Sequence, residues 1–441
     1  MRKIVNSSLL LVALSTLATS QAATEADVES SFHPYGRDSA NTGELSGYTP
    51  EMVIDQGNYQ QFVDALPEGL SQHLDQGWYR LKTMPVASVE LAESYQQATR
   101  DHLNATTLGV EFGQINGYIA GRPFPEEPNL NDPRAAEKIA WNFQRGYAVG
   151  DSLRINPFFW NYRNLDSGKR ERRVEFDAYM LAYMGRVDIE PLPNLAENRP
   201  GVYRGFYLRA LKPYDVTNTQ LLIHRYADDS KRDDSWMYLG FQRRVRRLGT
   251  GQTTDSFLGS DLMIEDFNGY NGRLSDYEWR FLGTADYFLP FYKHDQLDQY
   301  ADDMDEQEDG YQFIGFGGQG NCFPQIKWQL RKTYRLEIKP KQADHPIGKR
   351  LLYLDAQTYT IAYQDTYDRG GLLWKSLIVG QAHPDYYESL GMGKGISFFD
   401  TFTAIDNQAH HCTTGQLRME ANSPAAEKQM FTVQHLRATG R

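Results

Sequence analysis

The stretch Thr333-Tyr334-Arg335-Leu336-Glu337-Ile338-Lys339 decides the fold class of this 441-residue chain. Its apolar side chains, Tyr334, Leu336 and Ile338, alternate with polar ones. Successive side chains of a β-strand point to opposite faces, so this alternation predicts a strand with one buried face. A second stretch, residues 359–364, has Tyr, Ile and Tyr at every other position. Together the two stretches predict a sheet with an apolar face.

More strands are predicted on either side of these stretches, and turn-forming residues separate them. Turns that begin with Asp at 228–230, 355–357 and 368–371 leave little chain between consecutive strands. Strands joined by short connections pair as hairpins, so the sheet is predicted to be antiparallel. A sheet this large must curl or be covered on one side. The further predicted strands span residues 221–226, 236–245, 351–354, 372–379 and 396–402.

The sequence before about residue 200 is irregular, and two helices are its clearest signals. One is predicted over Ser88–Leu103 and the other over Pro133–Tyr147, with Asp132 as its N-cap. Residues 117–125 between them are rich in Gly and Pro and predict a loop. We therefore divide the chain into a signal peptide (1–22), a mixed region whose helices pack on the sheet (23–200) and an antiparallel half-barrel domain (201–441).

The first 22 residues have the three parts of a secretory signal peptide. Arg2 and Lys3 form a basic start, residues 9–17 are largely apolar, and Ser20-Gln21-Ala22 offers small residues for cleavage. A membrane anchor is the alternative, but the apolar run is shorter than the roughly 20 residues that span a bilayer. No Cys follows the cleavage site, so a bacterial lipid anchor is not expected. The sequence thus predicts a periplasmic protein.

Charge and cysteine content narrow the classes of partner and ligand. The chain has 46 basic and 57 acidic residues, a net charge of −11, which argues against nucleic acid as a partner. Its two cysteines, Cys322 and Cys412, predict one disulfide in an oxidising compartment. The alternative is a metal site of Cys412 with His410 and His411, which we disfavour because adjacent His side chains rarely reach one ion. No metal ion is predicted.

The motifs of nucleotide binding and catalysis are incomplete in this chain. Residues 315–320 match G-x-G-x-x-G, but Asn-Cys-Phe-Pro follows where a helix would have to hold the pyrophosphate. The acidic run 303–308 lacks the Gly and the bidentate Glu of a calcium loop. Neither the G-x-S-x-G elbow nor H-E-x-x-H occurs. We predict no catalytic residue, no cofactor and no enzymatic activity.

Local motifs follow one another in the order of a known bacterial family. The C-terminal block is the most specific, with Tyr353-Leu354-Asp355 followed by D-x-Y-D-x-x-G-x-L-W over 365–374. On these motifs the chain resembles the domain-of-unknown-function family labelled outer membrane lipoprotein-sorting protein. The sheet of that family is similar to that of the Lol carriers LolA and LolB. The other matching segments are 58–62, 95–99, 104–105, 121–125, 140–142, 236–238, 243–247, 266–269 and 276–279.

The resemblance covers nearly the whole chain after residue 22. It implies an incomplete antiparallel barrel whose apolar concave face is covered by helices. It also implies a carrier role without covalent chemistry, and an association with exporters of the resistance-nodulation-division type. Since the chain lacks the cysteine that anchors LolB, the soluble LolA-like role is the better match. We therefore expect a soluble periplasmic carrier that holds the acyl chain of a lipid or an acylated protein in an apolar cavity.

Candidate ligand contacts come from the alternating strands, although a filled core is the more usual role of such residues. Arg243 and Arg244 are candidates for contacts with a charged head group, or for pairing with nearby carboxylates. Two other functions stay open. An envelope glycan-processing enzyme needs two facing carboxylates, and a docking module for a transporter needs an exposed apolar patch. The candidate cavity residues are Leu221, Ile223, Met237, Leu239, Phe241, Tyr334, Leu336, Ile338, Tyr359, Ile361 and Tyr363.

Overall fold

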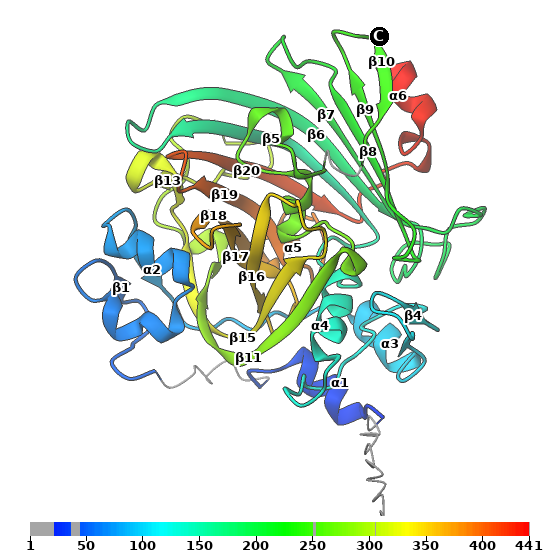
Figure 1. The fold of residues 1–441 in the computed structure, drawn as a ribbon, viewed down its shortest axis with the longest axis horizontal. Helices are drawn as coiled ribbons and strands as arrows, with labels where there is room; N and C mark the ends of the chain where they lie inside the picture. The colour runs from blue at the N-terminus through cyan, green and yellow to red at the C-terminus, as the bar shows by residue number, and fades with distance from the viewer. Residues whose placement is uncertain (1–21, 37–44, 250–252, 305, 441) are drawn as a thin grey trace, which may run out of the picture.

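The computed structural model describes residues 22–36, 45–249, 253–304 and 306–440. The predicted signal peptide therefore lies outside the described residues, except for Ala22. Most of the long strands belong to one sheet of 16 strands, which curves through the molecule in Figure 1. In the described ranges no helix has both the length and the apolar character needed to cross a membrane.

The sheet follows the order β1-β2-β15-β16-β17-β18-β19-β20-β5-β6-β7-β8-β9-β10, and β11 and β12 pair with β15 and β18. Neighbouring strands are antiparallel except for β2 with β15 and β12 with β18. The sheet is not closed into a barrel within the described residues, which confirms the predicted class of a curved, mainly antiparallel sheet. Its strands are β1 (Val53–Ile54), β2 (Leu81–Thr83), β5 (Ser152–Asn164), β6 (Arg170–Ala182), β7 (Val202–Lys212), β8 (Gln220–Tyr226), β9 (Asp234–Leu239), β10 (Arg244–Arg247), β11 (Tyr277–Leu289), β12 (Phe291–Tyr292), β15 (Lys327–Pro340), β16 (Ile347–Asp355), β17 (Ile361–Asp368), β18 (Leu373–Ala382), β19 (Phe398–Asp406) and β20 (His411–Ala421).

Two central strands, β5 and β6, lie in the region that we predicted to be irregular. They stand between β20 and β7, so the sheet begins well before residue 201. The sequences of β5 and β6 lack the alternation of polar and apolar residues for a physical reason. Phe158, Phe159 and Trp160 follow one another because both faces of β5 are packed, which removes the alternation of polar and apolar residues. The register also shifts between Ile155 and Phe158, which breaks the period of two.

Other predicted boundaries also need correction. The strand predicted over 236–245 is a hairpin of β9 and β10, and Arg243 in its turn has φ of 51°. The predicted helices are shorter, with α3 at Glu93–Asp101 and α4 at Ala135–Gln144. Asp132 is not the N-cap of α4, which is Arg134, although Asp132 accepts a hydrogen bond from the Arg134 N–H. The loop predicted over 117–125 contains no helix or strand.

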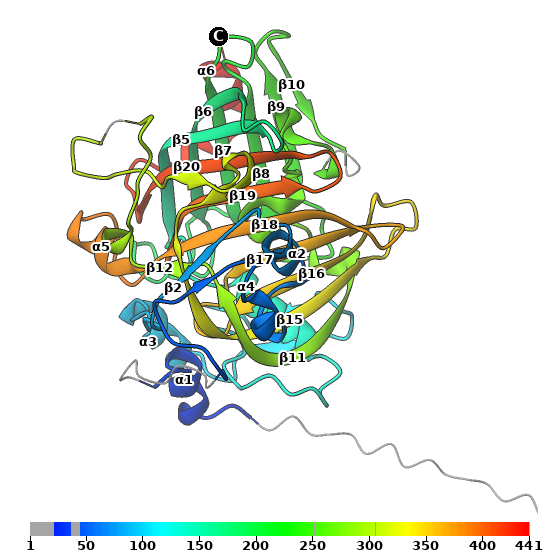
Figure 2. The same cartoon turned by 90° about the vertical axis from the view of Figure 1, so that its left-hand side faces the viewer.

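Segments from both ends of the chain cover one face of the sheet. Helix α2 (Glu68–Asp75) lies across β17 and β18, where Gly69 N–H donates to Asp365 (Figure 2). The C-terminal η8 (Lys428–Met430) and α6 (Val433–Thr439) pack with Phe431 and Leu436 against Tyr207 of β7 and its neighbours. The loop after β12 reaches β5 through the ring contact of Phe313 with Phe159. This outer face is therefore filled by packing.

The inner face is covered by α4 and by residues 257–271, which we name the cover segment. It contains η3 (Phe257–Gly259) and η4 (Ile264–Gly269), and η5 (Leu274–Asp276) follows it. The remaining elements are α1 (Glu25–Phe32), α5 (Pro384–Ser389), η1 (Tyr59–Ala65), η6 (His294–Gln296), η7 (Gln319–Asn321), β3 (Thr107–Leu108), β4 (Ile115–Asn116), β13 (Phe316–Gly317) and β14 (Phe323–Pro324).

Candidate functional site

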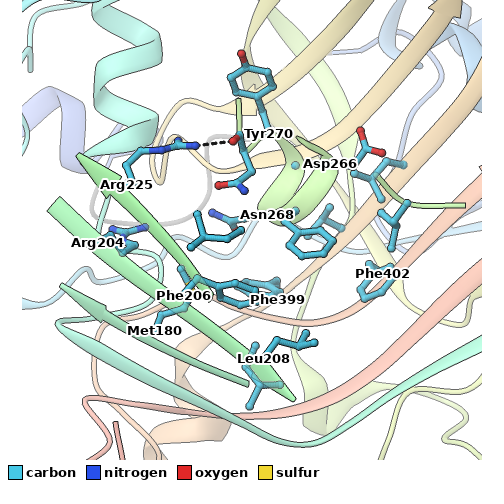
Figure 3. Close-up of a pocket in the computed structure, with 18 of the residues that line it drawn as sticks. Met180, Arg204, Phe206, Leu208, Arg225, Asp266, Asn268, Tyr270, Phe399 and Phe402 are labelled. Carbon is cyan, nitrogen blue, oxygen red and sulfur yellow. Dashed lines mark hydrogen bonds between the residues drawn. The ribbon is translucent and has the colours of Figure 1, made fainter. Parts of the chain in front are cut away.

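An apolar cavity of about 140 Å³ lies between the inner face of the sheet and the cover segment. Strands β5 to β8 form one side, β18 and the β19 region form another, and the end of α4 closes it. Figure 3 shows Met180, Phe206, Leu208, Phe399 and Phe402 around this space. Its other apolar walls are Phe143, Ile155, Phe158, Trp160, Ile223, Leu262, Phe267, Leu377 and Val379.

Strand alternation places these side chains on the inner face. On β7, Arg204, Phe206 and Leu208 line the cavity, while Tyr207 packs on the outer face. Across the sheet, Gly415 of β20 pairs with Trp160 of β5. A Cβ at Gly415 would overlap the ring of Phe402, so glycine here allows that ring to lie flat against the strand. The aromatic wall therefore depends on a residue without a side chain.

The cover segment closes the cavity with aromatic contacts. The Phe267 ring centre lies 5.9 Å from those of Trp160 and Phe206. Asn268 and Gly269 have φ of 55° and 85°, and this turn directs the chain back towards the sheet. A Cβ on Gly269 would lie 2.7 Å from Ile361 Cβ, so the segment approaches β17 as closely as only glycine permits.

Ion pairs at Arg350 and His411 fix the cover segment to the sheet. Asp266 lies 3.0 Å from the guanidinium of the fully buried Arg350. Burial lowers the pKa of Arg350, but the carboxylates of Asp266 and Glu265 outweigh this and raise it, so the arginine stays charged. Asp261 Oδ2 lies 2.7 Å from His411 Nδ1 on β20, and this hydrogen bond raises the pKa of His411.

Two arginines on neighbouring strands line the cavity beside its apolar walls. Arg204 and Arg225 are direct cross-strand partners in the register of β7 and β8. Arg225 pairs with Asp233 at 2.6 Å and donates to the Asn271 carbonyl, as the dashed line in Figure 3 shows. Arg204 forms no ion pair with any described carboxylate, and its buried Nε has no hydrogen-bond partner there. One positive charge at the cavity is therefore unbalanced.

The predicted cavity residues are mostly elsewhere. Of the eleven, Ile223 alone lines this cavity. Leu221 and Tyr363 are buried in the main core, and Met237 packs against it. Leu239 is half-buried, and Phe241 is 76% exposed at the β9–β10 turn. The remaining five, which fill a second core that includes α4, are Tyr334, Leu336, Ile338, Tyr359 and Ile361.

The exposed Arg243 and Arg244 at the β9–β10 hairpin do not line the cavity either. Sequence reasoning missed Trp160, Phe206 and Phe402, which form much of its wall. The alternation of Arg204, Phe206 and Leu208 was a usable signal for β7. No periodic signal marks Trp160, because both faces of β5 are buried.

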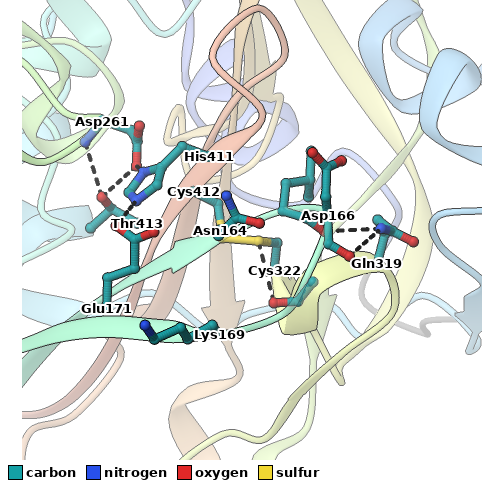
Figure 4. The surroundings of a disulfide bond; sticks show 12 residues. Asn164, Asp166, Lys169, Glu171, Asp261, Gln319, Cys322, His411, Cys412 and Thr413 are labelled. Atoms are coloured by element: carbon teal, nitrogen blue, oxygen red, sulfur yellow. Dashed lines mark hydrogen bonds and ion pairs between the residues drawn. A yellow bond between two sulfur atoms is a disulfide. The ribbon is translucent and has the colours of Figure 1, made fainter.

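The predicted disulfide between Cys322 and Cys412 is present, with a Cα–Cα distance of 6.0 Å (Figure 4). It joins the loop after η7 to β20. His410 and His411 contact different carboxylates, Asp166 at 3.0 Å and Asp261 at 2.7 Å. Within the described ranges, no three His, Cys, Asp or Glu side chains form a group suited to a metal ion.

The family model described as "Protein of unknown function (DUF1329)" matches residues 53–437 of the chain. An uncharacterized protein of Pseudomonas aeruginosa is 26% identical over 356 residues, which cover 77% of this chain and 70% of that protein.

Three solved structures align with this chain at low identity. A DUF1329 family protein from Desulfovibrio piger has 16% identity and a TM-score of 0.46, covering 69% of this chain and 98% of that one. A putative outer membrane lipoprotein-sorting protein domain from Vibrio parahaemolyticus has 18% identity and a TM-score of 0.44, covering 68% and 97%. A LolA superfamily protein from Nitrosomonas europaea has 10% identity and a TM-score of 0.38, covering 68% and 98%.

Proposed function

The chain belongs to the DUF1329 family, and from this premise we propose that it is a carrier for a lipid or for the acyl chain of a lipoprotein. The acyl chain occupies the cavity beneath the cover segment. The observation that carries this proposal is the composition of the cavity wall, which is built mainly from aromatic and aliphatic side chains of the inner face. Each methylene that leaves water for such a wall contributes about 0.8 kcal/mol.

The size of the cavity limits how much of an acyl chain it can hold. Its volume of about 140 Å³ is close to that of an engineered apolar cavity that binds benzene. The closed form thus has room for part of an acyl chain, and a whole chain requires the cover segment to move outward. Such a movement would have to separate the buried Phe257, Leu262 and Ile264 from the core as well as the ion pairs at Arg350 and His411.

The wall of the cavity favours the carrier over the two alternative functions. A glycosidase needs two carboxylates facing each other, whereas Asp266 is the one carboxylate among the lining residues and is paired with Arg350. A docking module would present a broad exposed apolar patch. The exposed Phe241 and Leu372 belong to two separate hairpins of the sheet.

The site of action follows from the predicted signal peptide. We place the mature carrier in the periplasm, where it would exchange its lipid or acylated protein with a membrane exporter of the resistance-nodulation-division type. Both the compartment and the exporter are part of the proposal.

Native mass spectrometry of gently purified protein, with lipid extraction, tests the carrier function. We expect a bound lipid and a rise of Tm on adding single-chain lipids, because a ligand of the folded state stabilises it. In the variant Met180→Trp, a larger side chain fills the cavity, and lipid binding should fall at least about tenfold. Phe241→Trp introduces the same side chain at the exposed hairpin and should bind as the wild type does. If no lipid is retained and none in a broad panel shifts Tm, the carrier function is wrong.

A further inference from the structure

We infer that the ligand of this cavity carries a negatively charged group, a carboxylate or a phosphate, and that Arg204 binds it. This inference rests on the proposed carrier function and specifies the chemistry of the ligand. Its starting point is the charge of the lining residues. Arg225 is balanced by Asp233 and Asp266 is balanced by Arg350, which leaves the guanidinium of Arg204 without a counter-charge among the described residues.

The position of Arg204 makes this imbalance costly. Its strand partner is Arg225, and like charges at directly opposed positions of an antiparallel pair destabilise a sheet. Its Nε is buried and has no hydrogen-bond partner within the part of the chain that the structure describes. A buried donor without an acceptor costs free energy, so an arrangement of this kind is expected where a ligand supplies the acceptor.

A second arginine, Arg145, contacts a residue of the cavity wall although it does not line the cavity itself. Arg145 is 2% exposed and forms no ion pair with a described carboxylate. Its guanidinium carbon lies 3.7 Å from the ring centre of Tyr203, a lining residue, and that of Arg204 lies 5.4 Å from the same ring. Two of its nitrogens, Nε and Nη1, also lack partners among the described residues. The ring of Tyr203 is thus contacted by two guanidinium groups, and neither is paired with a described carboxylate.

The apolar wall and this cationic end together define an amphipathic ligand. Figure 3 shows Arg204 next to Phe206 and Met180, so a chain that fills the aromatic part of the cavity would begin at the guanidinium. Carboxylate and phosphate groups accept paired hydrogen bonds from a guanidinium, and such charge-assisted bonds are stronger than neutral ones. The cavity wall has a second buried donor without a described partner, the indole N–H of Trp160. This donor also requires a hydrogen-bond acceptor on the ligand.

The test compares ligands that share one chain length and differ in their end group. Isothermal titration of the full mature protein is carried out with dodecanoate, dodecyl phosphate, dodecanol and inorganic phosphate. We expect the two anionic amphiphiles to bind at least about tenfold more tightly than dodecanol. Inorganic phosphate distinguishes a free anion from a head group. We expect inorganic phosphate to bind far more weakly than dodecyl phosphate. Equal affinity for the two would contradict the inference that the ligand is amphipathic.

Substitutions of Arg204 test whether this residue causes the preference for anionic amphiphiles. Arg204→Gln should remove the preference for the anionic amphiphiles over dodecanol, while Arg204→Lys should retain part of it. Arg244→Gln, at the exposed hairpin, is the matched control and should behave as the wild type does. Equal affinity of the wild-type protein for dodecanol and dodecanoate would overturn the inference and leave the carrier function intact. A lack of binding by every chain would overturn both.

Discussion

His410 and His411 are adjacent in the sequence but contact different parts of the molecule. His410 is exposed and contacts Asp166 beyond β5, whereas His411 holds Asp261 of the cover segment. Asp261 also accepts a hydrogen bond from Thr413, and Lys375 donates to its carbonyl. The contact of His411 is therefore part of a polar cluster that anchors one end of the cover segment.

This anchor should make stability depend on pH. Because the pKa of His411 is raised in the folded protein, its charged form stabilises the fold fully below about pH 6.5, and this contribution is lost as pH rises through the folded pKa. The Tm difference between wild type and His411→Gln should be larger near pH 5.5 than near pH 9. His410→Gln, at the exposed pair, should change Tm little at either pH. A difference for His411→Gln that grows with pH would contradict this assignment.

At the scale of elements, the cover segment differs from the helices on the outer face. It borders the cavity and contributes Phe257, Leu262 and Ile264 to the main core. The ring of Phe267, the close approach of Gly269 and the ion pairs at Arg350 and His411 add to these contacts. The outer elements α2 and α6 pack instead against filled core. Because the cover segment lines the cavity and α2 and α6 do not, it is the element whose movement would admit a ligand.

Removing the Phe267 ring should loosen the cover segment locally. In Phe267→Ala, amide hydrogen exchange over residues 257–271 is expected to accelerate at least about tenfold, because the contacts with Trp160 and Phe206 are lost. Exchange in α6 should not change.

Phe431→Ala is the matched control, since it removes a buried ring from the outer face. It should accelerate exchange over residues 428–439 and leave the cover segment unchanged. Uniform acceleration across the sheet in Phe267→Ala would show that the ring supports the whole fold and not this element.

At the scale of the whole molecule, the sheet gathers distant parts of the chain. Strand β20 near the C-terminus pairs with β5, and the outer face is covered by α2 from one end of the sequence and by α6 from the other. The disulfide adds a covalent link between Cys322 and Cys412, which are 90 residues apart. Such a link restricts the unfolded chain more than the folded one.

Loss of the disulfide should therefore lower global stability. For the double variant Cys322→Ser/Cys412→Ser, the loop of this length predicts a loss of about 4–5 kcal/mol in the free energy of unfolding. Urea unfolding followed by tryptophan fluorescence measures it. Reduced wild-type protein should show a similar loss, and a change below about 1 kcal/mol in both samples would argue that the cross-link restricts the unfolded chain little.

The sequence by itself determined the fold class, because alternation with a period of two is a local property of each strand. It predicted β8 almost over its whole length and parts of β15 to β19, and it predicted the cysteine pair from composition alone. It missed β7, β11 and β20, and it missed β5 and β6, where packing on both faces removes the alternation.

Only the tertiary structure decided where the cavity lies. Alternation predicts that Tyr334, Leu336 and Ile338 are buried, but it does not predict whether they pack against side chains or line a cavity. In the structure they pack in the filled core that includes α4. The cavity is formed where residues 143–144, β5 to β8, the cover segment, β18 and the β19 region come together. The unpaired charge of Arg204 is likewise a property of these neighbours and not of its own segment.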